Sequence, residues 1–230
     1  VEEENISPSI LHCVPLFHVT GSHAGFLMSV LSGRKMVLMS KWDAGLALKL
    51  IQNEKITAIT GVPTQTWDLL NHPDRDKYDL SSLADLSGGG APRPPEHVKR
   101  LNDEMDGRPS IGYGLSETNA LGTLNAGDDY LKHPSSCGRA VPPVTDVAIV
   151  DQDWNFLNES DHGEVVIKSP ANMIGYWGNP DATDEVFNDE GWFKTGDLGY
   201  MKDDFLFIVD RVKDLVIRGG ENISCIEVES

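Results

Sequence analysis

The sequence predicts an α/β protein in which parallel-sheet α/β layers are followed by a small β-barrel-like subdomain. Short apolar runs alternate with segments of helical spacing as far as about residue 138, and such alternation is typical of parallel strands joined by crossover helices. After Gly138 short strands separated by turn residues replace the alternation, which favours a small all-β unit. We therefore expect an α/β portion over residues 1–138, a barrel-like subdomain over 139–209 and a final segment over 210–230.

The first strand is expected at residues 10–14, an apolar run that Pro15 ends. Apolar spacing over residues 21–31 predicts a helix, and residues 34–39 predict a buried strand after it. Asp43 then stands where a helix can begin. Its short carboxylate can accept hydrogen bonds from the free backbone N–H groups of a first helical turn, so we expect it to be the N-cap.

Two further strand and helix pairs complete the α/β portion. The β-branched run at residues 55–62 predicts a strand, and Pro63 can take the first helical position because the N–H that it lacks would be unpaired there. A short strand at 83–86, a glycine loop at 87–92 and a helix at 94–105 follow. Because parallel strands end at one edge of a sheet, the loops that follow them can line a common crevice.

The stretch from Ser110 to Thr118 concentrates polar groups at the end of the next predicted strand. It reads Ser-Ile-Gly-Tyr-Gly-Leu-Ser-Glu-Thr, so two glycines bracket Tyr113, and Ser116 and Glu117 follow closely. Glycines let backbone N–H groups approach a ligand, tyrosine offers a flat face to a purine, and a carboxylate can hold a hard cation. The stretch therefore indicates a nucleotide site, with an ordinary strand-to-helix loop as the alternative.

The subdomain after residue 138 is expected to contain four short strands, at residues 144–150, 164–168, 198–201 and 205–209. Aspartate-rich turns separate these strands. One helix is predicted to begin at Pro180, because acidic residues and a hydroxyl that can cap a helix follow it within one turn.

A lone acid and a cation in this subdomain suggest a contact with a nucleoside. Asp197 follows the turn residues Thr195 and Gly196 and is predicted to stand at a strand start, and Arg211 follows the apolar run at 205–209. A carboxylate can accept hydrogen bonds from both hydroxyls of a ribose, and an arginine beside it can support that contact. The alternative for each residue is a solvated turn charge in a local ion pair.

Composition excludes several classes of partner. The formal net charge of −17 argues against a general basic surface for nucleic acid or an anionic membrane. No apolar run reaches the length of a transmembrane helix and no signal peptide is evident, so we expect a cytoplasmic protein. The three widely spaced cysteines indicate neither a disulfide framework nor a thiolate zinc site.

Two local patterns are weaker guides to chemistry. Four possible metal ligands lie near the start, but they lack helix-face spacing and a proline interrupts them, so a metal site is disfavoured: His12, Cys13, His18 and His23. The segment 114–118 is one residue short of a hydrolase nucleophile elbow. Thr118 replaces its final glycine, and the β-branched side chain would be hard to fit in that tight turn.

Six motifs, in order and at similar spacing, resemble the acyl-adenylate-forming superfamily, which includes acyl-CoA synthetases, coumarate-CoA ligases, luciferases and the adenylation domains of peptide synthetases. The motifs are Pro15-Leu16-Phe17-His18, Gly89-Gly90-Ala91-Pro92, Gly112-Tyr113-Gly114-Leu115-Ser116-Glu117-Thr118, Gly175-Tyr176-Trp177, Gly191-Trp192-Phe193-Lys194-Thr195-Gly196-Asp197 and Asp210-Arg211-Val212-Lys213-Asp214. Each motif alone is weakly specific, whereas six in register are very specific. The resemblance spans nearly the whole chain.

The resemblance implies a two-step, AMP-forming ligation. A carboxylate would attack the α-phosphate of ATP to give acyl-AMP and pyrophosphate, and a thiol, usually coenzyme A, would then displace AMP. The implied ligands are ATP or AMP, Mg²⁺, coenzyme A as co-substrate and a small fatty or aryl carboxylic acid. An in-line displacement at phosphorus is served mainly by positioning and charge neutralisation.

The resemblance also implies roles for single residues around the nucleotide. Five residues of the two glycine motifs would edge the adenine and acyl pocket or contact the adenine: Gly89, Gly90, Ala91, Gly112 and Tyr113. Ser116 would contact phosphate and Glu117 would coordinate magnesium, so both would act in catalysis. Asp197 would hold the ribose hydroxyls with help from Arg211, and Ile208 would pack nearby.

The remaining implied roles concern the acid, the thiol and a hinge. His18 would act at the acyl pocket. Lys213 falls at the family's hinge, about which a small C-terminal domain rotates between the two steps, and Gly219 and Gly220 would line the passage for the thiol. Residues 210–230 would then be the hinge and the start of that domain.

Two features of the family are missing from the 230 residues. Its Ser/Thr/Gly-rich phosphate loop with a lysine lies upstream of the His18 motif, and its catalytic lysine lies in the C-terminal domain. We therefore expect a fragment, truncated at both ends, that covers the middle and end of the large N-terminal domain and does not form acyl-AMP at a useful rate alone. A truncated, non-catalytic module that binds a nucleotide or a partner is the alternative.

Overall fold

Seven strands form the larger of two main sheets. The computed structural model describes residues 6–105, 107–212, 216–218 and 221–223. The strands of the first sheet are β1 (Ser9–His12), β2 (Lys35–Leu38), β3 (Ala58–Gly61), β4 (Asp85–Gly89), β5 (Arg108–Tyr113), β6 (Thr123–Ala126) and β7 (Arg139–Ala140). Their order is β2-β1-β3-β4-β5-β6-β7. The first five are parallel, whereas β6 pairs antiparallel with β5 and β7.

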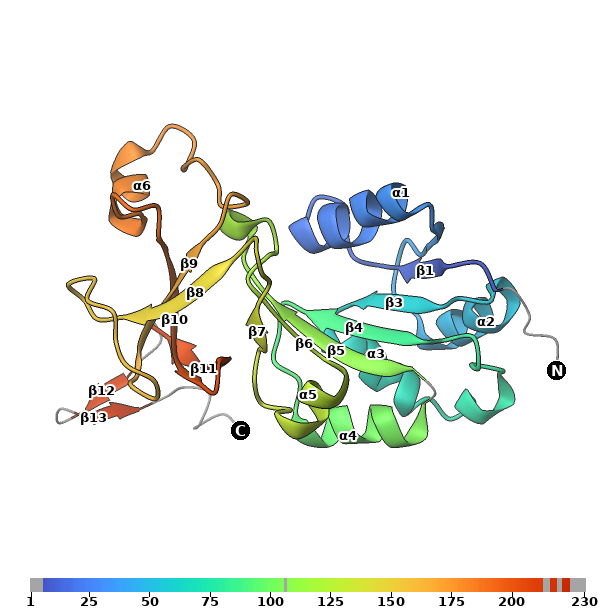
Figure 1. Ribbon diagram of the computed structural model, residues 1–230. Coiled ribbons are helices and arrows are strands. Elements are labelled where there is room, and N and C mark those ends of the chain that lie inside the picture. Colours follow the sequence, from blue (N-terminus) through green and yellow to red (C-terminus); the bar gives the residue numbers. More distant parts are fainter. Residues whose placement is uncertain (1–5, 106, 213–215, 219–220, 224–230) are drawn as a thin grey trace.

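Helices cover both faces of this sheet (Figure 1). One face carries α2 (Ala44–Glu54), α3 (Pro63–Leu70) and α4 (Pro95–Glu104), and the other carries the π-helix η1 (Thr20–Leu27) with α1 (Met28–Ser32). Three short helices, η2 (Arg75–Lys77), η3 (Ser116–Thr118) and α5 (Gly127–Lys132), complete the α/β portion. Among the described residues no helix combines the length and the apolar character needed to cross a membrane.

The main core lies between the first sheet and the helices α2, α3 and α4. It is built from fully buried aliphatic side chains, among them Leu48, Ile51, Ile59, Leu86 and Leu101. Apolar residues three or four apart lie on one face of a helix, and alternate residues lie on one face of a strand. These two sets of apolar side chains pack against each other in the core. This packing fixes the carboxyl ends of β4 and β5, where the glycine motifs lie.

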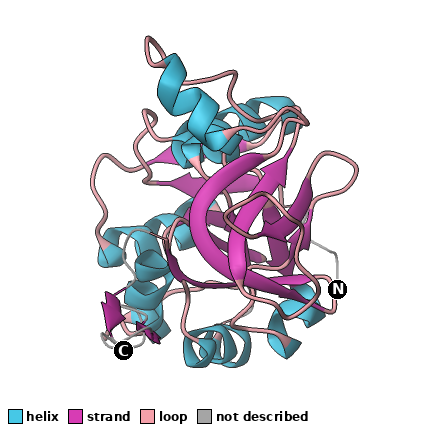
Figure 2. Ribbon diagram, turned by 90° about the vertical axis from the view of Figure 1, so that its left-hand side faces the viewer, coloured by secondary structure: helices cyan, strands magenta, loops and turns pink. Residues whose placement is uncertain are grey.

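Four antiparallel strands form the second sheet, in the order β11-β10-β9-β8. They are β8 (Asp146–Val150), β9 (Gly163–Lys168), β10 (Phe193–Lys202) and β11 (Phe205–Arg211), and α6 (Pro180–Val186) lies in the connection between β9 and β10. A short pair, β12 (Val216–Arg218) and β13 (Glu221–Ile223), follows. Figure 2 shows the long, curved strands of the second sheet from the side. The prediction of a parallel α/β portion followed by a separate β unit is confirmed.

The two sheets are joined at Leu206, which is fully buried. Its backbone N–H donates to Gly138 O at 2.8 Å, and its carbonyl accepts from Cys137 N at 2.9 Å. The Ser136 hydroxyl donates to the same carbonyl at 2.7 Å. Burial raises the pKa of the Cys137 thiol to about 11, so this cysteine is an unreactive packing residue at the junction.

Three details of the predicted first sheet are wrong. The strand expected to be buried at residues 34–39 is β2, which lies at the sheet edge and is largely exposed. The strand expected at 83–86 begins and ends later, so Gly88 and Gly89 belong to β4 and not to a loop. After Tyr113 the chain passes through the single turn η3 (Ser116–Thr118) into β6, and β6, α5 and β7 were not predicted.

The predicted N-cap at Asp43 is confirmed. Its Oδ1 accepts a hydrogen bond of 2.7 Å from Leu46 N, and Asp43 itself has an extended backbone before α2 begins. We expect Asp43→Ala to lower the free energy of unfolding by about 1 kcal/mol, because it leaves an N–H group of the first turn without its partner. Urea unfolding followed by circular dichroism measures this loss. Asp43→Ser is the control, since a serine hydroxyl also caps, and equal losses in both variants would contradict the capping role.

Candidate functional site

Two glycines meet where β4 and β5 end. Gly89 and Gly112 are register partners in these parallel strands, so the two glycine motifs lie at one edge of the sheet, as the sequence predicts. A side chain at Gly89 would bring its Cβ within 3.2 Å of the Gly112 carbonyl oxygen. Gly90 has φ +74°, a left-handed conformation that glycine adopts without strain. Ala91 follows as an exposed residue, so this edge is open to a ligand.

A buried arginine ties the two strands together beneath this edge. Arg93 donates from Nη1 to Ser110 O at 3.2 Å and from Nη2 to Leu86 O at 3.4 Å. Burial lowers the pKa of Arg93 from its ordinary value. A side chain at Gly88 would displace the Arg93 guanidinium, because its Cβ would lie 2.6 Å from Arg93 Nη2. Arg93 was not predicted as a site residue, since nothing in its local sequence shows that a cation follows the loop into the core.

A tyrosine and an arginine each contact one oxygen of the Asp197 carboxylate. The Tyr113 hydroxyl donates a hydrogen bond of 2.6 Å to Asp197 Oδ2, and Arg211 Nε lies 3.2 Å from Asp197 Oδ1. Burial, and then the Asp197 charge, raises the pKa of Tyr113 far above its ordinary value, so the phenol remains a donor. Since Tyr113 ends β5 and Asp197 lies in β10, this contact connects the two sheets.

A bulge in β10 presents Asp197. The pairing of β10 with β9 is interrupted between Lys194 and Leu198, and Gly196 within the gap has φ +76°. The Thr195 hydroxyl donates to Val165 O at 2.8 Å and accepts from Asp197 N at 3.1 Å. The expectation that Asp197 stands at a strand start is therefore wrong. The bulge inside a long strand turns its carboxylate toward β5.

Arg211 belongs to the end of β11 and not to a turn after it. It is the register partner of Asp197 in the antiparallel pair of β10 and β11. Ile208, in the same strand, packs against the buried group of Ile149, Val165 and Leu206, which Tyr113 also contacts. The apolar contact of Ile208 and the ion pair of Arg211 therefore support the same pair, Tyr113 and Asp197, from one strand.

A single turn of 3-10 helix, η3 (Ser116–Thr118), follows β5. The Thr118 hydroxyl accepts from Leu115 N at 3.0 Å and closes the turn. Gly114 is required, because its Cβ would lie 2.5 Å from the carbonyl carbon of Ala120. Thr118 is buried, whereas Ser116 is exposed and Glu117 is partly exposed, so the turn presents a hydroxyl and a carboxylate at the edge where β4 and β5 end.

The Glu117 carboxylate has one protein partner in the described part of the chain. The Tyr176 hydroxyl donates to its Oε1 at 3.0 Å, which leaves Oε2 open. Among the described residues no group of three or more His, Cys, Asp or Glu side chains could hold an ion. Magnesium that arrives with a nucleotide usually takes one or two protein carboxylates and completes its octahedron with phosphate oxygens and waters. Glu117 fits that role.

The other predicted site residues are not joined to this group. His18 lies exposed in the turn before η1, and its ring lies 4.8 Å from the ring of Phe17. No hydrogen bond or ring contact within the described ranges links it to Glu117 or Asp197. Lys213, Gly219 and Gly220 lie outside the described residues.

Architecture and site together define a class of protein. A parallel-dominated sheet with a separate antiparallel sheet matches the N-terminal domains of adenylate-forming enzymes. Residues 2–177 match the family model described as AMP-binding enzyme, and the chain belongs to that family.

Similar proteins carry names of CoA ligases. The chain is 40% identical over 222 residues to a long-chain-fatty-acid–CoA ligase of Bacillus subtilis, covering 96% of this chain and 39% of that protein. It is 36% identical to a feruloyl-CoA synthase of Amycolatopsis, with 96% and 44% covered. The structure of O-succinylbenzoate coenzyme A synthetase from Bacillus subtilis with ATP and magnesium superposes with TM-score 0.87 at 30% identity, with 96% and 45% covered. The chain therefore spans less than half the length of these proteins.

Proposed function

We propose that this chain supplies the nucleotide-binding part of an ATP-dependent acyl-CoA synthetase. A carboxylic acid and ATP would give acyl-AMP and pyrophosphate, and coenzyme A would then displace AMP to give the thioester. The observation that carries the proposal is the contact of Asp197 with both Tyr113 and Arg211, because it brings three residues of three separate motifs to one point. Membership of the AMP-binding enzyme family supports the same reaction class.

The nucleoside would lie across the junction of the two sheets. The ribose hydroxyls would donate to the Asp197 carboxylate, whose oxygens each retain a second lone pair beside Tyr113 and Arg211. The adenine would rest on Tyr113 and the open backbone of Gly112, with Gly89, Gly90 and Ala91 at its other edge. Because the bulge and the ion pair already hold Asp197, little ordering remains for binding to impose.

The phosphates would extend toward η3. Ser116 would donate its hydroxyl to a phosphate oxygen, and Glu117 would hold the magnesium ion that arrives with ATP. The ion neutralises charge on the phosphates, and the carboxylate fixes where that charge is neutralised. Both residues would therefore act on the adenylation step through position and not through covalent chemistry.

The acid is proposed to be a small fatty or aryl carboxylic acid, and His18 to line its pocket. Relatives named for long-chain fatty acids, for ferulate and for O-succinylbenzoate support this range and do not select within it. We further propose a cytoplasmic enzyme with an α/β portion at 1–138, a β subdomain at 139–209 and a hinge at 210–230. Lys213 would then lie at the hinge, and Gly219 and Gly220 would line the path of the thiol.

The full-length protein tests this function directly. We expect exchange of labelled pyrophosphate into ATP that depends on an added carboxylic acid, and thioester formation when coenzyme A is supplied. Separate series of straight-chain fatty acids and aryl acids would identify the substrate class. Binding of AMP without any acid-dependent exchange would instead favour a non-catalytic nucleotide-binding module, and failure to bind AMP would contradict both functions.

The isolated 230 residues are expected to release no pyrophosphate in response to acids. The sequence holds neither the phosphate loop nor the C-terminal lysine of the family, so two cations that would neutralise the developing charge are missing. Release of pyrophosphate is measured with the isolated chain and the full-length protein at equal concentration. Acid-dependent release of pyrophosphate from the isolated chain would contradict the expectation.

A further inference from the structure

The segment between β9 and α6 lies over η3, and three hydrogen bonds join it to Glu117 and Asn119. This covering arm, residues 169–178, runs from the end of β9 toward α6 (Figure 1). Met173 N donates to the Glu117 carbonyl at 2.6 Å, and the Tyr176 hydroxyl donates to Glu117 Oε1 at 3.0 Å. Asn119 Nδ2 donates to Ala171 O at 2.6 Å. The arm thus binds both the backbone and the side chain of Glu117.

Tyr176 is itself held by the first turn of α6. Its backbone N–H donates to Thr183 Oγ1 at 2.9 Å, and the Thr183 hydroxyl donates to Asn179 O at 3.1 Å. Gly175 allows this approach, because its Cβ would lie 2.8 Å from Thr183 Cγ2. Asn179 caps α6 by accepting from Ala182 N at 3.2 Å. The backbone of Tyr176 is therefore anchored by a hydrogen bond to the capped first turn of α6.

The chemistry of the pair determines what this contact can do. A tyrosine hydroxyl carries its proton at neutral pH, since the pKa of an ordinary phenol is about 10, and Tyr176 donates that proton in its hydrogen bond to Glu117. One donated hydrogen bond at Oε1 fixes the rotation of the Glu117 carboxylate. The other oxygen remains free for a cation. Groups that orient a ligand of a metal in this way commonly change metal affinity about 10- to 100-fold when they are removed.

We propose that Tyr176 is a positioning residue for magnesium, holding the Glu117 carboxylate so that its free oxygen faces the ion that accompanies ATP. The inference rests on the proposed function, in which Glu117 binds that ion. It assigns a task to the Gly175-Tyr176-Trp177 motif, and it makes α6 the support of the metal ligand through Thr183. Tyr176 would touch neither ATP nor the ion.

The test is the magnesium dependence of acid-dependent pyrophosphate exchange in full-length protein carrying Tyr176→Phe. We expect the magnesium concentration at half-maximal rate to rise about tenfold, and the magnesium concentration at half-maximal ATP binding, measured by isothermal titration without any acid, to rise by a similar factor. The loss of rate should shrink as magnesium approaches saturation, and the KM for the acid should stay unchanged. A residue that only stabilised the fold would lower the rate at every magnesium concentration and leave the half-maximal concentration where it was, and that result would overturn the inference.

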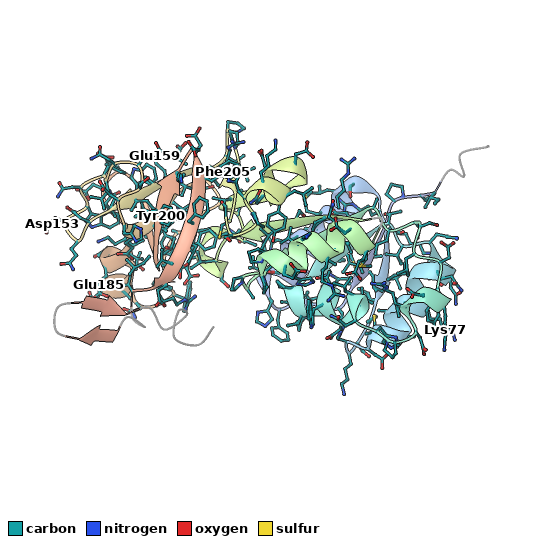
Figure 3. All side chains as sticks on the ribbon, turned by 90° about the horizontal axis from the view of Figure 1, so that it is seen from below. Lys77, Asp153, Glu159, Glu185, Tyr200 and Phe205 are labelled. Carbon is teal, nitrogen blue, oxygen red and sulfur yellow. The ribbon has the colours of Figure 1, made fainter. Side chains whose placement is uncertain are left out.

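Tyr78→Phe is the matched control. Tyr78 packs against the main core, and its neighbour Lys77 lies at the end of the molecule opposite Glu185 of α6 (Figure 3). This variant should show the same magnesium dependence as the protein without substitutions. A shift as large as that of Tyr176→Phe would overturn the inference. Glu117→Gln and the double variant Glu117→Gln with Tyr176→Phe should share one magnesium dependence, because Tyr176 acts through the Glu117 charge.

The outcomes separate this inference from the function on which it rests. A magnesium shift in Glu117→Gln without one in Tyr176→Phe would overturn the role of Tyr176 and leave the proposed function intact. No magnesium shift in either variant would overturn the metal role of Glu117 and the inference with it. If the unchanged full-length protein showed no acid-dependent exchange, the proposed function would fail, and the inference would fall for that separate reason.

Discussion

Replacing Asp197 with alanine in the full-length protein is expected to raise the dissociation constant for AMP by at least about 100-fold. The buried carboxylate would accept hydrogen bonds from both ribose hydroxyls, and a hydrogen bond to a charged group contributes about 1.5–3 kcal/mol. The variant also removes the partner of the Tyr113 hydroxyl and of Arg211, which lie 2.6 Å and 3.2 Å from its oxygens. Tyr113 would lose the contact that keeps it beside the nucleotide.

Isothermal titration with AMP measures this loss. Asp197→Asn keeps the shape of the side chain and one acceptor oxygen, so it should bind AMP with an intermediate affinity. Asp189→Ala is the matched control, since Asp189 is an exposed acid in the turn before β10 and its loss should leave AMP binding unchanged. A change of less than about threefold for Asp197→Ala, in protein shown by its thermal unfolding to be folded, would remove Asp197 from the nucleotide site.

Glu117→Gln is expected to lower acid-dependent pyrophosphate exchange by about 100-fold at limiting magnesium, the size of the loss when one preorganised electrostatic contact is removed. Glutamine has nearly the same shape, and its amide oxygen can still accept from the Tyr176 hydroxyl, which lies 3.0 Å from Glu117 Oε1. The 3-10 turn should therefore keep its geometry. What the variant removes is the negative charge that would hold magnesium.

The second step separates this effect from a general loss of activity. Thioester formation from chemically prepared acyl-AMP should be less affected by Glu117→Gln, because no pyrophosphate is formed in that step. Glu190→Gln, which changes an exposed acid near Gly191, controls for the loss of one charge. An unchanged rate of exchange in Glu117→Gln would remove Glu117 from the mechanism.

Local signals predicted much of the α/β portion. Pro63 begins α3, Asp43 caps α2 and the β-branched run before Pro63 contains β3. These succeed because a cap, a proline at the first helical position and the apolar period each act within about one turn of the chain. The same reasoning wrongly predicted that β2 is buried, because an apolar run looks the same in a central strand and in an edge strand.

The contacts of the candidate site were not predictable in this way. Tyr113 and Asp197 are 84 residues apart, and Tyr176 and Glu117 are 59 residues apart. The sequence indicated a nucleotide contact at each motif separately, but Tyr176 had no role and Arg93 was overlooked. Neither residue has a neighbour in sequence that reveals its partner, because each partner arrives from another strand or helix.

The sequence by itself determined the residue types at the site, the order of the motifs and the alternation that produces a parallel sheet. Only the tertiary structure decided that the bulge in β10 turns Asp197 toward Tyr113, and that the covering arm lays Tyr176 against Glu117. The physical reason is the distance along the chain over which each kind of interaction acts. Backbone propensity and capping act over a few residues, whereas a hydrogen bond between side chains depends on the packing of whole sheets and forms only where that packing brings donor and acceptor within about 3 Å.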